Sequence, residues 1–253
     1  MIFSGKCVVV TGAGSGIGRA FAAGFCADGA TVIGFGRTRA DLEETARLCE
    51  AGRMHFIVGD VGRPDDVERL FSEALRLCGK VDILVNNAAL YPKTPFLEST
   101  HGEWSRAIQT NVVGLAHCCR MVLPGMLERG FGRIINLGSL AWMGPIANSS
   151  AYSASKGAVR VFTRALATEI DRSRYPDVLI NELLPGIVRT RMSSDGEDPK
   201  NVYAHARLLA SLPPNGPTGR TFLRSAIYIE NHGLRARVRR LIARLSLGLV
   251  RSE

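Results

Sequence analysis

The sequence predicts one α/β domain built on a doubly wound parallel sheet. Short apolar segments alternate with helical patterns over the first 190 residues, and several of these segments are continuously apolar. Strand–helix–strand repetition implies parallel strands with helices on both faces, and continuous apolar strands indicate burial on both sides. The chain has 253 residues, of which 46% are hydrophobic and 22% charged. This composition is typical of a globular protein and excludes disorder as a description of the whole chain.

Six strands are predicted, because each segment is short and rich in β-branched residues. They cover residues 6–11, 31–35, 56–58, 81–85, 133–137 and 178–183. Helices are expected between them, at 17–27, around 42–48, and at 67–77, 104–127 and 152–170. After Pro185 the pattern weakens, and residues 195–200 and 212–219 are typical of loops because they are rich in Pro, Gly or charge. Residues 216–222 offer a short seventh strand.

A glycine-rich turn, TGAGSGIG from Thr11 to Gly18, joins the first predicted strand to the first predicted helix. Glycines let the backbone approach a pyrophosphate, and the helix N-terminus offers free N–H groups and a partial positive charge. Since the turn lies at the first strand-to-helix connection, it indicates a Rossmann-like dinucleotide-binding fold more strongly than a merely structural turn. The cofactor-binding residues expected here are Gly12, Ser15, Gly16, Ile17 and Gly18.

The end of the second predicted strand indicates which dinucleotide is bound. In such folds a carboxylate about 20 residues beyond the glycines binds the ribose 2′-hydroxyl of NAD. Here the strand is followed by Arg37 and Arg39, and the next carboxylate is Asp41. An arginine can hold a 2′-phosphate bidentately, whereas a carboxylate would repel it. We therefore expect NADP(H) in preference to NAD(H), with Arg37 as the main contact; the alternative is that both arginines are solvated.

With this loop, the segment Tyr152-Ser153-Ala154-Ser155-Lys156 resembles the short-chain dehydrogenase/reductase family over about residues 6–190. The other matching segments are Asp60-Val61, Asn86-Asn87-Ala88-Ala89, Asn111 in NVVG, Ser139, and Pro185-Gly186-Ile187-Val188-Arg189-Thr190. The segment at Asn86 departs from the family pattern, because Ala89 stands where Gly is usual. Together and in this order the motifs are specific, although no single one is decisive.

The resemblance implies a proton-transfer set of Asn111, Ser139, Tyr152 and Lys156. Tyr152 and Lys156 are four residues apart on a predicted helix and share one face. A phenol has a pKa of about 10, and we expect the nearby ammonium to lower it. By resemblance, Tyr152 exchanges the proton and Ser139 binds the substrate oxygen, while Asn111 anchors a water relay to Lys156. The bland alternatives are a polar residue inside a helix for Asn111 and a turn residue for Ser139.

The resemblance also implies further cofactor contacts. Lys156 holds the nicotinamide ribose beside Tyr152, and Asp60, with Val61 next to it, contacts the adenine amino group. The other implied contacts are Asn87 and Ala88, and the loop of Pro185, Gly186, Val188 and Thr190, which covers the nicotinamide. A substrate lid is expected at about 190–212, with Met192, Tyr203, Leu208 and Leu209 on one wall of an apolar pocket. Trp142, Met143 and Pro145 are expected on the opposite wall, with contributions from Leu90, Tyr91 and Pro92.

We divide the chain into a catalytic domain at 1–222, whose cofactor half covers about 1–100, and a basic helical tail at 223–253. The net charge is +9, and residues 212–253 hold eight arginines against two glutamates. Apolar residues at helical spacing over 234–250 predict a basic amphipathic helix. Docking on this chain or a sister subunit is the favoured interpretation, and peripheral membrane contact is the second. Nucleic-acid binding is disfavoured because interleaved aromatics and a known motif are lacking.

The sequence thus predicts an NADP(H)-dependent ketoreductase that acts on a hydrophobic or aromatic carbonyl or secondary alcohol, as a homodimer or homotetramer. The alternatives are an NAD(H)-dependent alcohol dehydrogenase and a catalytically silent nucleotide-binding regulator. Hydrolase chemistry is disfavoured because Ser139 lacks a G-x-S-x-G context. Six cysteines and five histidines show no metal-ligand spacing. A cytoplasmic setting is expected, since we find no secretory signal and no apolar run of ~18 residues.

Overall fold

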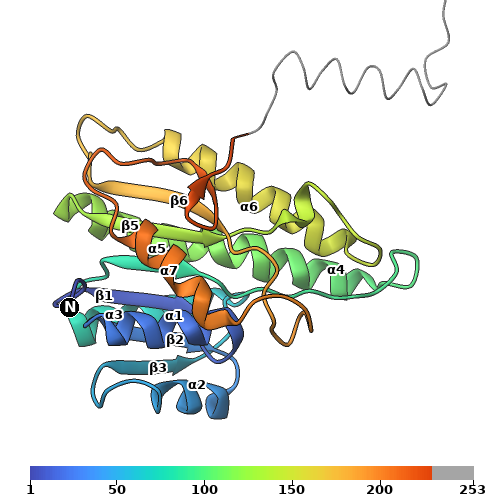
Figure 1. The fold of residues 1–253 in the computed structure, drawn as a ribbon, viewed down its shortest axis with the longest axis horizontal. Helices are drawn as coiled ribbons and strands as arrows, with labels where there is room; N and C mark the ends of the chain where they lie inside the picture. The colour runs from blue at the N-terminus through green and yellow to red at the C-terminus, as the bar shows by residue number, and fades with distance from the viewer. Residues whose placement is uncertain (230–253) are drawn as a thin grey trace, which may run out of the picture.

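The structure, a computed structural model that describes residues 1–229, contains one eight-stranded sheet (Figure 1). Its strands are β1 (Cys7–Thr11), β2 (Thr31–Gly36), β3 (Met54–Val58), β4 (Ile83–Asn86), β5 (Gly132–Leu137), β6 (Val178–Leu184), β7 (Thr221–Leu223) and β8 (Ala226–Ile227). Their order is β3-β2-β1-β4-β5-β6-β7-β8, and only the β7–β8 pair among these is antiparallel. The strand order therefore reverses between β1 and β4, because the chain passes from β3 in one half of the sheet to β4 in the other. Such folds bind nucleotides at this point of reversal.

Helices cover both faces of the sheet, as the buried strands require. One face is covered by α1 (Gly16–Ala27), α2 (Arg39–Ala46) and α7 (Pro199–Ala210), and the other by α3 (Pro64–Cys78), α5 (Leu115–Arg129) and α6 (Ser150–Thr168). The first apolar cluster includes Phe21, Leu42 and Leu209, and the second includes Phe71 and Met126. The helices on both faces hold the sheet rigid, so the loops at the carboxyl ends of its strands are positioned to form a site together.

The helix predicted at 104–127 is not one continuous α-helix. It begins earlier, as α4 (His101–Ile108), passes through one π-helical segment, η1 (Gln109–Gly114), and continues as α5. The buried amide of Asn111 lies in η1 and bonds to neighbouring segments, as described below. Gly114 lets the helix approach the backbone, because a Cβ there would lie 2.4 Å from the carbonyl oxygen of Val61. π-helical turns of this kind are frequent at functional sites.

The chain end is only partly described. The short seventh strand is present as β7, and it pairs with β6 in parallel. Residues 223–229, which the sequence assigns to the tail, contain the end of β7 and all of β8, a strand that the sequence did not indicate. The amphipathic helix predicted at 234–250 lies outside the described residues.

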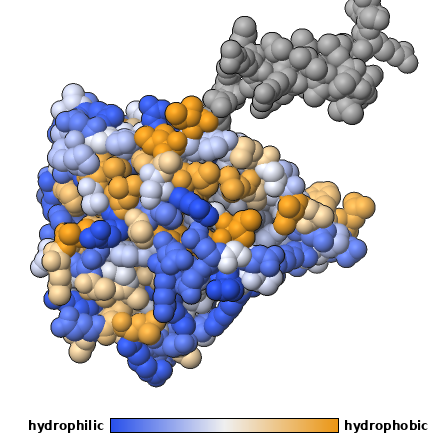
Figure 2. All heavy atoms as spheres, viewed as in Figure 1, coloured by the Kyte–Doolittle hydropathy of each residue, from blue (hydrophilic) through white to orange (hydrophobic). Residues whose placement is uncertain are grey.

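The visible surface mixes hydrophilic and hydrophobic residues (Figure 2). Among residues 1–229, the most exposed large apolar side chain is that of Leu97, which is 95% exposed and precedes α4 together with the exposed Phe96. Within residues 1–229, we find no helix with both the length and the apolar character needed to cross a bilayer.

Candidate functional site

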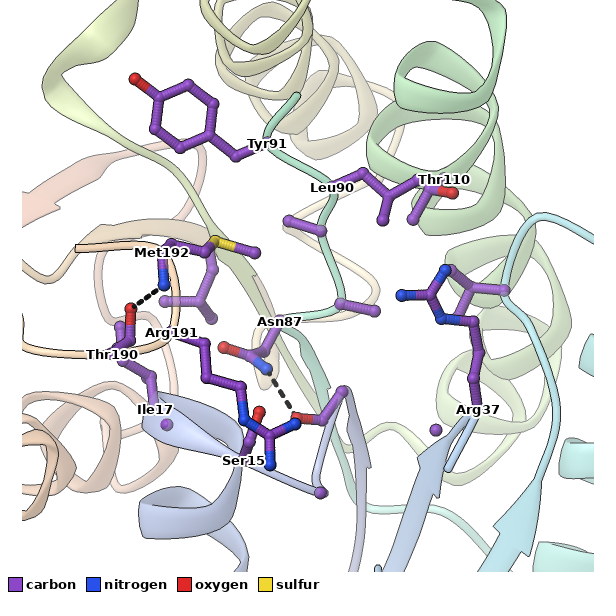
Figure 3. Close-up of a pocket in the computed structure, with 18 of the residues that line it drawn as sticks. Ser15, Ile17, Arg37, Asn87, Leu90, Tyr91, Thr110, Thr190, Arg191 and Met192 are labelled. Atoms are coloured by element: carbon purple, nitrogen blue, oxygen red, sulfur yellow. Dashed lines mark hydrogen bonds between the residues drawn. The ribbon is translucent and has the colours of Figure 1, made fainter. Parts of the chain in front are cut away.

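A cleft of about 410 Å³ lies at the carboxyl edge of the parallel strands. Its wall comes from the loops after β1, β2, β3, β4, β5 and β6, and from the start of α6. Figure 3 shows side chains from the segments after β1, β2, β4 and β6 around it. Of the predicted site residues, those that line it are Gly12, Ser15, Gly16, Ile17, Arg37, Asp60, Val61, Asn87, Ala88, Tyr152, Lys156, Pro185 and Thr190. The cleft therefore brings together residues from widely separated segments of the chain, in the place where such folds bind dinucleotides.

The glycine-rich end of the cleft fits a pyrophosphate. The α1 N-cap residue Ser15 makes no side-chain cap bond, and the first turn of α1 has no acidic residue. The Asn87 amide nitrogen donates to the carbonyl oxygens of Thr11, at 2.9 Å, and Gly12, at 3.2 Å. A Cβ on Gly18 would lie 2.0 Å from the Gly12 oxygen, so this loop closes directly onto the helix. Gly18 thus shapes the site from behind and is not among the lining residues.

Two arginine side chains, Arg37 and Arg191, also line the cleft, and Arg191 lies beside the glycine-rich loop (Figure 3). Arg37 lines it and is exposed, whereas Arg39 is not among the lining residues and lies 3.8 Å from the Glu43 carboxylate. Arg191 makes two bonds of 2.8 Å to the Asp41 carboxylate, 150 positions away in the sequence. This hydrogen bonding holds the pKa of Asp41 below its ordinary value. The carboxylate that follows β2 is therefore neutralised by a cation from the segment after β6.

Asp60, which follows β3, lines the cleft as well. Its Oδ1 accepts from the backbone N–H of Gly62 at 2.8 Å, and its own backbone N–H donates to Asp66 at 3.0 Å. Because both backbone and side chain are held, the carboxylate has a defined position against the cleft. It can accept a hydrogen bond from an amino group there.

Tyr152 and Lys156 lie one turn apart on α6 and both line the cleft. The Lys156 ammonium is buried and donates to the backbone oxygen of Leu137 at 2.6 Å. It lies 5.6 Å from the centroid of the Tyr152 ring. Tyr91 stacks on that ring with centroids 4.4 Å apart and planes inclined by 26°. The predicted pair is thus assembled, with a second phenol lying flat against the first.

The pKa of Tyr152 differs from the sequence expectation. Burial raises it above the ordinary phenol value, hydrogen bonding with Ser139 lowers it, and Tyr91 raises it. The expected lowering is wrong for this structure, because the desolvation of the buried phenol outweighs its hydrogen bonding with Ser139. Burial lowers the pKa of Lys156 to about 8, while the charge of Glu182 acts in the raising direction. Lys156 is therefore the more easily titrated of the two groups.

Ser139 and Asn111 hold the site together without lining the cleft. The Ser139 hydroxyl accepts from the backbone of Ala141 at 3.2 Å and caps a short 3-10 turn. The Asn111 side chain accepts from the backbone of Leu90 at 2.7 Å and donates to its oxygen at 2.9 Å. It also donates to the Ser155 hydroxyl at 2.9 Å. Asn111 thus fixes the loop after β4 to α6, and its bonds reach the neighbour of Lys156.

Several residues expected around the substrate lie elsewhere. Of the four expected on the lid, only Met192 lines the cleft. Tyr203 instead packs on Phe25 and donates to Asp28 at 2.7 Å, and Leu209 is buried, because α7 lays its apolar side on α1. Leu208, Trp142, Met143 and Pro145 do not line the cleft either, and Pro92 lines a separate, very small pocket. Leu90 and Tyr91 do line it, as expected.

Gly186 and Val188 also are not among the residues that line the cleft. Gly186 has a φ of 89°, which turns the chain between Pro185 and Thr190. Val188 is buried in the apolar cluster beneath α1 and α7. These two residues therefore shape the loop that the resemblance places over the nicotinamide, while its ends face the cleft.

Three features were missed by sequence reasoning. They are the stacking of Tyr91 on Tyr152, the pairing of Arg191 with Asp41, and the buried Glu182 described below. No local pattern signals the first two, since each joins segments that are far apart in sequence. An acidic residue inside a predicted apolar strand is a signal for the third.

Comparison with known proteins agrees with this architecture. A model of the short chain dehydrogenase family matches residues 6–201. L-xylulose reductase of Homo sapiens is 34% identical over 193 residues, which are 76% of this chain and 75% of that protein. Meso-2,3-butanediol dehydrogenase of Serratia marcescens is 32% identical over 194 residues, which are 77% of this chain and 76% of that protein.

A solved structure is similar over a larger part of the chain. A variant of actinorhodin polyketide ketoreductase with NADPH has a TM-score of 0.80 and 28% sequence identity. The match covers 86% of this chain and 94% of that one. The similarity thus extends over both the nucleotide end of the cleft and the segment that carries Tyr152 and Lys156.

Proposed function

We propose that this chain, which belongs to the short-chain dehydrogenase family, is an NADP(H)-dependent reductase that interconverts a ketone and a secondary alcohol. Members of the family are oxidoreductases that bind NAD(P) and act on the CH–OH and C=O groups of small molecules. The proposed proton transfer rests on the position of Tyr152 and Lys156 on α6. Tyr152 and Lys156 line the same cleft as the glycine-rich loop, so an acid and a cation stand where a dinucleotide would end.

Each side chain has a chemical task in this reaction. The nicotinamide supplies the hydride when it is bound. The phenol of Tyr152 donates the proton to the developing alkoxide, and in the reverse direction it takes the proton from the alcohol. Ser139, which hydrogen-bonds to Tyr152, also binds the substrate oxygen. The Lys156 ammonium offsets negative charge as the proton leaves Tyr152.

The substrate end of the cleft favours a hydrophobic or aromatic carbonyl. Leu90, Tyr91 and Met192 line it, and Tyr91 covers the ring of Tyr152. A flat apolar group would gain contact area against these side chains, and an aromatic one would also stack. Binding a substrate close to the phenol would require the stacked Tyr91 ring to share or yield that space.

Incubation with NADPH and a panel of ketones, ranging from small aliphatic to aromatic, tests the proposed reaction. We expect the absorbance of the reduced nicotinamide to fall with apolar and aromatic members and to change little with short polar ones. No loss of absorbance with any ketone, and no reduction of NADP⁺ by the matching alcohols, would exclude the proposed activity.

The preference for NADP(H) rests on charge at the nucleotide end. Arg37 lines the cleft, and Arg191 neutralises Asp41, the carboxylate that would otherwise repel a 2′-phosphate. A guanidinium can form two charge-assisted bonds to a phosphate. Arg37 is therefore the residue that we assign to the 2′-phosphate.

Replacing Arg37 with Ala should weaken NADPH binding by about 10- to 100-fold, since a hydrogen bond to a charged group contributes ~1.5–3 kcal/mol. NADH binding should hardly change, because it lacks the 2′-phosphate. Both dissociation constants can be measured by nucleotide fluorescence. Arg39→Ala is the matched control, because Arg39 lies outside the cleft lining. Tighter binding of NADH than NADPH by the unmodified chain would contradict the assignment.

A further inference from the structure

β6 contains a buried acidic residue that the proposed reaction does not use. Glu182 is 1% exposed, and its backbone pairs with Asn136 in β5. Val178 and Ile180 belong to the apolar cluster that α6 covers. Since side chains alternate along a strand, Glu182 points to that same face. A carboxylate here must be paired, because burial of an isolated charge is very costly.

The two carboxylate oxygens have different surroundings. Oε2 accepts from the Thr221 hydroxyl at 2.6 Å and lies 3.7 Å from the Arg160 guanidinium, which itself donates to Thr221 at 2.8 Å. Oε1 is buried and makes no hydrogen bond within the described residues. It lies against Gly138, where a Cβ would be only 2.1 Å away. Gly138 lines the cleft, so this oxygen lies directly beneath the site floor.

Two cations of α6 act on this carboxylate: the Arg160 guanidinium lies 3.7 Å from it, and the buried Lys156 ammonium interacts with it through its charge. Tyr152, Lys156 and Arg160 are spaced by four residues and so share one side of the helix. Lys156 is 4% exposed, and its hydrogen bond goes to a neutral backbone oxygen. Within residues 1–229, the ionisable groups on the same side of α6 as Lys156 are Tyr152 and Arg160, and β6 contributes Glu182. β5 contributes the Leu137 carbonyl, and the neutral Thr221 of β7 bridges Arg160 and Glu182.

We propose that Glu182 is a positioning residue of this site, whose buried carboxylate is the counter-charge shared by Lys156 and Arg160. Arg160 has other anchors besides the carboxylate, among them the Trp142 ring, on which its guanidinium stacks at 4.2 Å. Lys156 depends more heavily on the charge of Glu182, since its hydrogen bond to the Leu137 oxygen is to an uncharged group. The catalytic consequence of this pairing rests on the proposed function, whereas the pairing itself does not.

The charge state of Lys156 follows from this arrangement. Burial alone favours the neutral amine, and the carboxylate opposes that tendency, so the pKa of about 8 keeps the ammonium mostly charged at neutral pH. Removing the negative charge must move the titration of Lys156 to lower pH. The amine would then lose its proton within the neutral range.

NMR titration of the lysine side chains tests the pairing without any turnover. The chain has five lysines, Lys6, Lys80, Lys93, Lys156 and Lys200, so Nζ-labelled lysine gives few signals, and Lys156→Met assigns the relevant one. We expect Glu182→Gln to lower the Lys156 midpoint by about one pH unit or more. Glu182→Asp, which keeps the charge, should hold it near the original value.

Asp82→Asn is the matched control, because Asp82 is also a buried carboxylate, 2% exposed, beside two lysines. It lies at the start of β4, at the opposite edge of the sheet. We expect this change to move Lys6 and Lys80 and to leave Lys156 unmoved. The proposal is overturned if the Lys156 midpoint is unchanged in Glu182→Gln, or if Asp82→Asn shifts it equally.

Two further measurements guard against ambiguous outcomes. If Glu182→Gln does not fold, Arg160→Gln tests whether the two cations share the Glu182 carboxylate. The Lys156 midpoint should then rise, and an unchanged midpoint overturns the proposal.

If the chain reduces ketones, the alkaline limb of kcat/KM for reduction should move to lower pH in Glu182→Gln. An NMR shift without any carbonyl reduction by the unmodified chain would support the pairing and refute the proposed function.

Discussion

Replacing Tyr152 with Phe should lower kcat for ketone reduction by about 10²–10⁴-fold, which is the usual contribution of a general acid. The change removes one hydroxyl and keeps the ring on which Tyr91 stacks. Cofactor binding should change far less than kcat, because the glycine-rich loop and Arg37 are untouched. Steady-state rates and a nucleotide dissociation constant, both at neutral pH, give the comparison.

Tyr175→Phe is the matched control for this variant. Tyr175 packs against the apolar cluster under α6 and does not line the cleft. Tyr175→Phe should therefore leave kcat unchanged. Equal turnover by the Tyr152 variant and the unmodified chain would refute the assigned proton transfer.

Replacing Gly18 with Ala should damage the nucleotide site from behind. The new methyl would lie 2.0 Å from the Gly12 oxygen and 2.5 Å from the Asn87 amide nitrogen, so the loop must move. Overpacking of this kind costs about 1–3 kcal/mol in the free energy of unfolding. A loop displaced by the methyl should also bind nucleotide more weakly, because its backbone N–H groups would no longer lie where they meet a pyrophosphate. Urea unfolding and nucleotide titration measure the two effects.

Gly144→Ala separates this effect from a general intolerance of alanine. A Cβ on Gly144 would meet no atom within 4 Å. Its stability and nucleotide affinity should match those of the unmodified chain. Normal affinity in Gly18→Ala would contradict the close packing that we assign to this loop.

The sequence predicted those parts of the fold that depend on local patterns. The buried strands, the glycine turn and the helix with Tyr152 are each signalled by residues close together in the chain. The interruption at 109–114 was missed, because the polar contacts of Asn111 are made with Leu90 and Ser155. Periodicity records which residues are apolar and carries no information on such distant hydrogen bonds.

Which residues meet in the cleft was predictable in part, and the electrostatics of the site less so. Spacing placed Tyr152 and Lys156 on one face, as the structure has them. The direction of the Tyr152 pKa shift was wrong, because burial is set by the whole fold and by the Tyr91 ring. Likewise, the sequence assigned Leu209 to a substrate lid, whereas the structure buries it against α1 in α7, a helix that the sequence did not predict. Helical spacing identifies an apolar face, and only the fold decides what covers it.

Transfer of isotope from reduced cofactor to product tests the account most directly. NADPH that carries deuterium on the transferring nicotinamide carbon is incubated with the best ketone of the panel, and the alcohol is analysed by mass spectrometry. We expect deuterium on the carbinol carbon in the unmodified chain and almost no product in Tyr152→Phe. Alcohol without deuterium from either face of the nicotinamide, or no alcohol at all from any ketone, would contradict hydride transfer in this cleft.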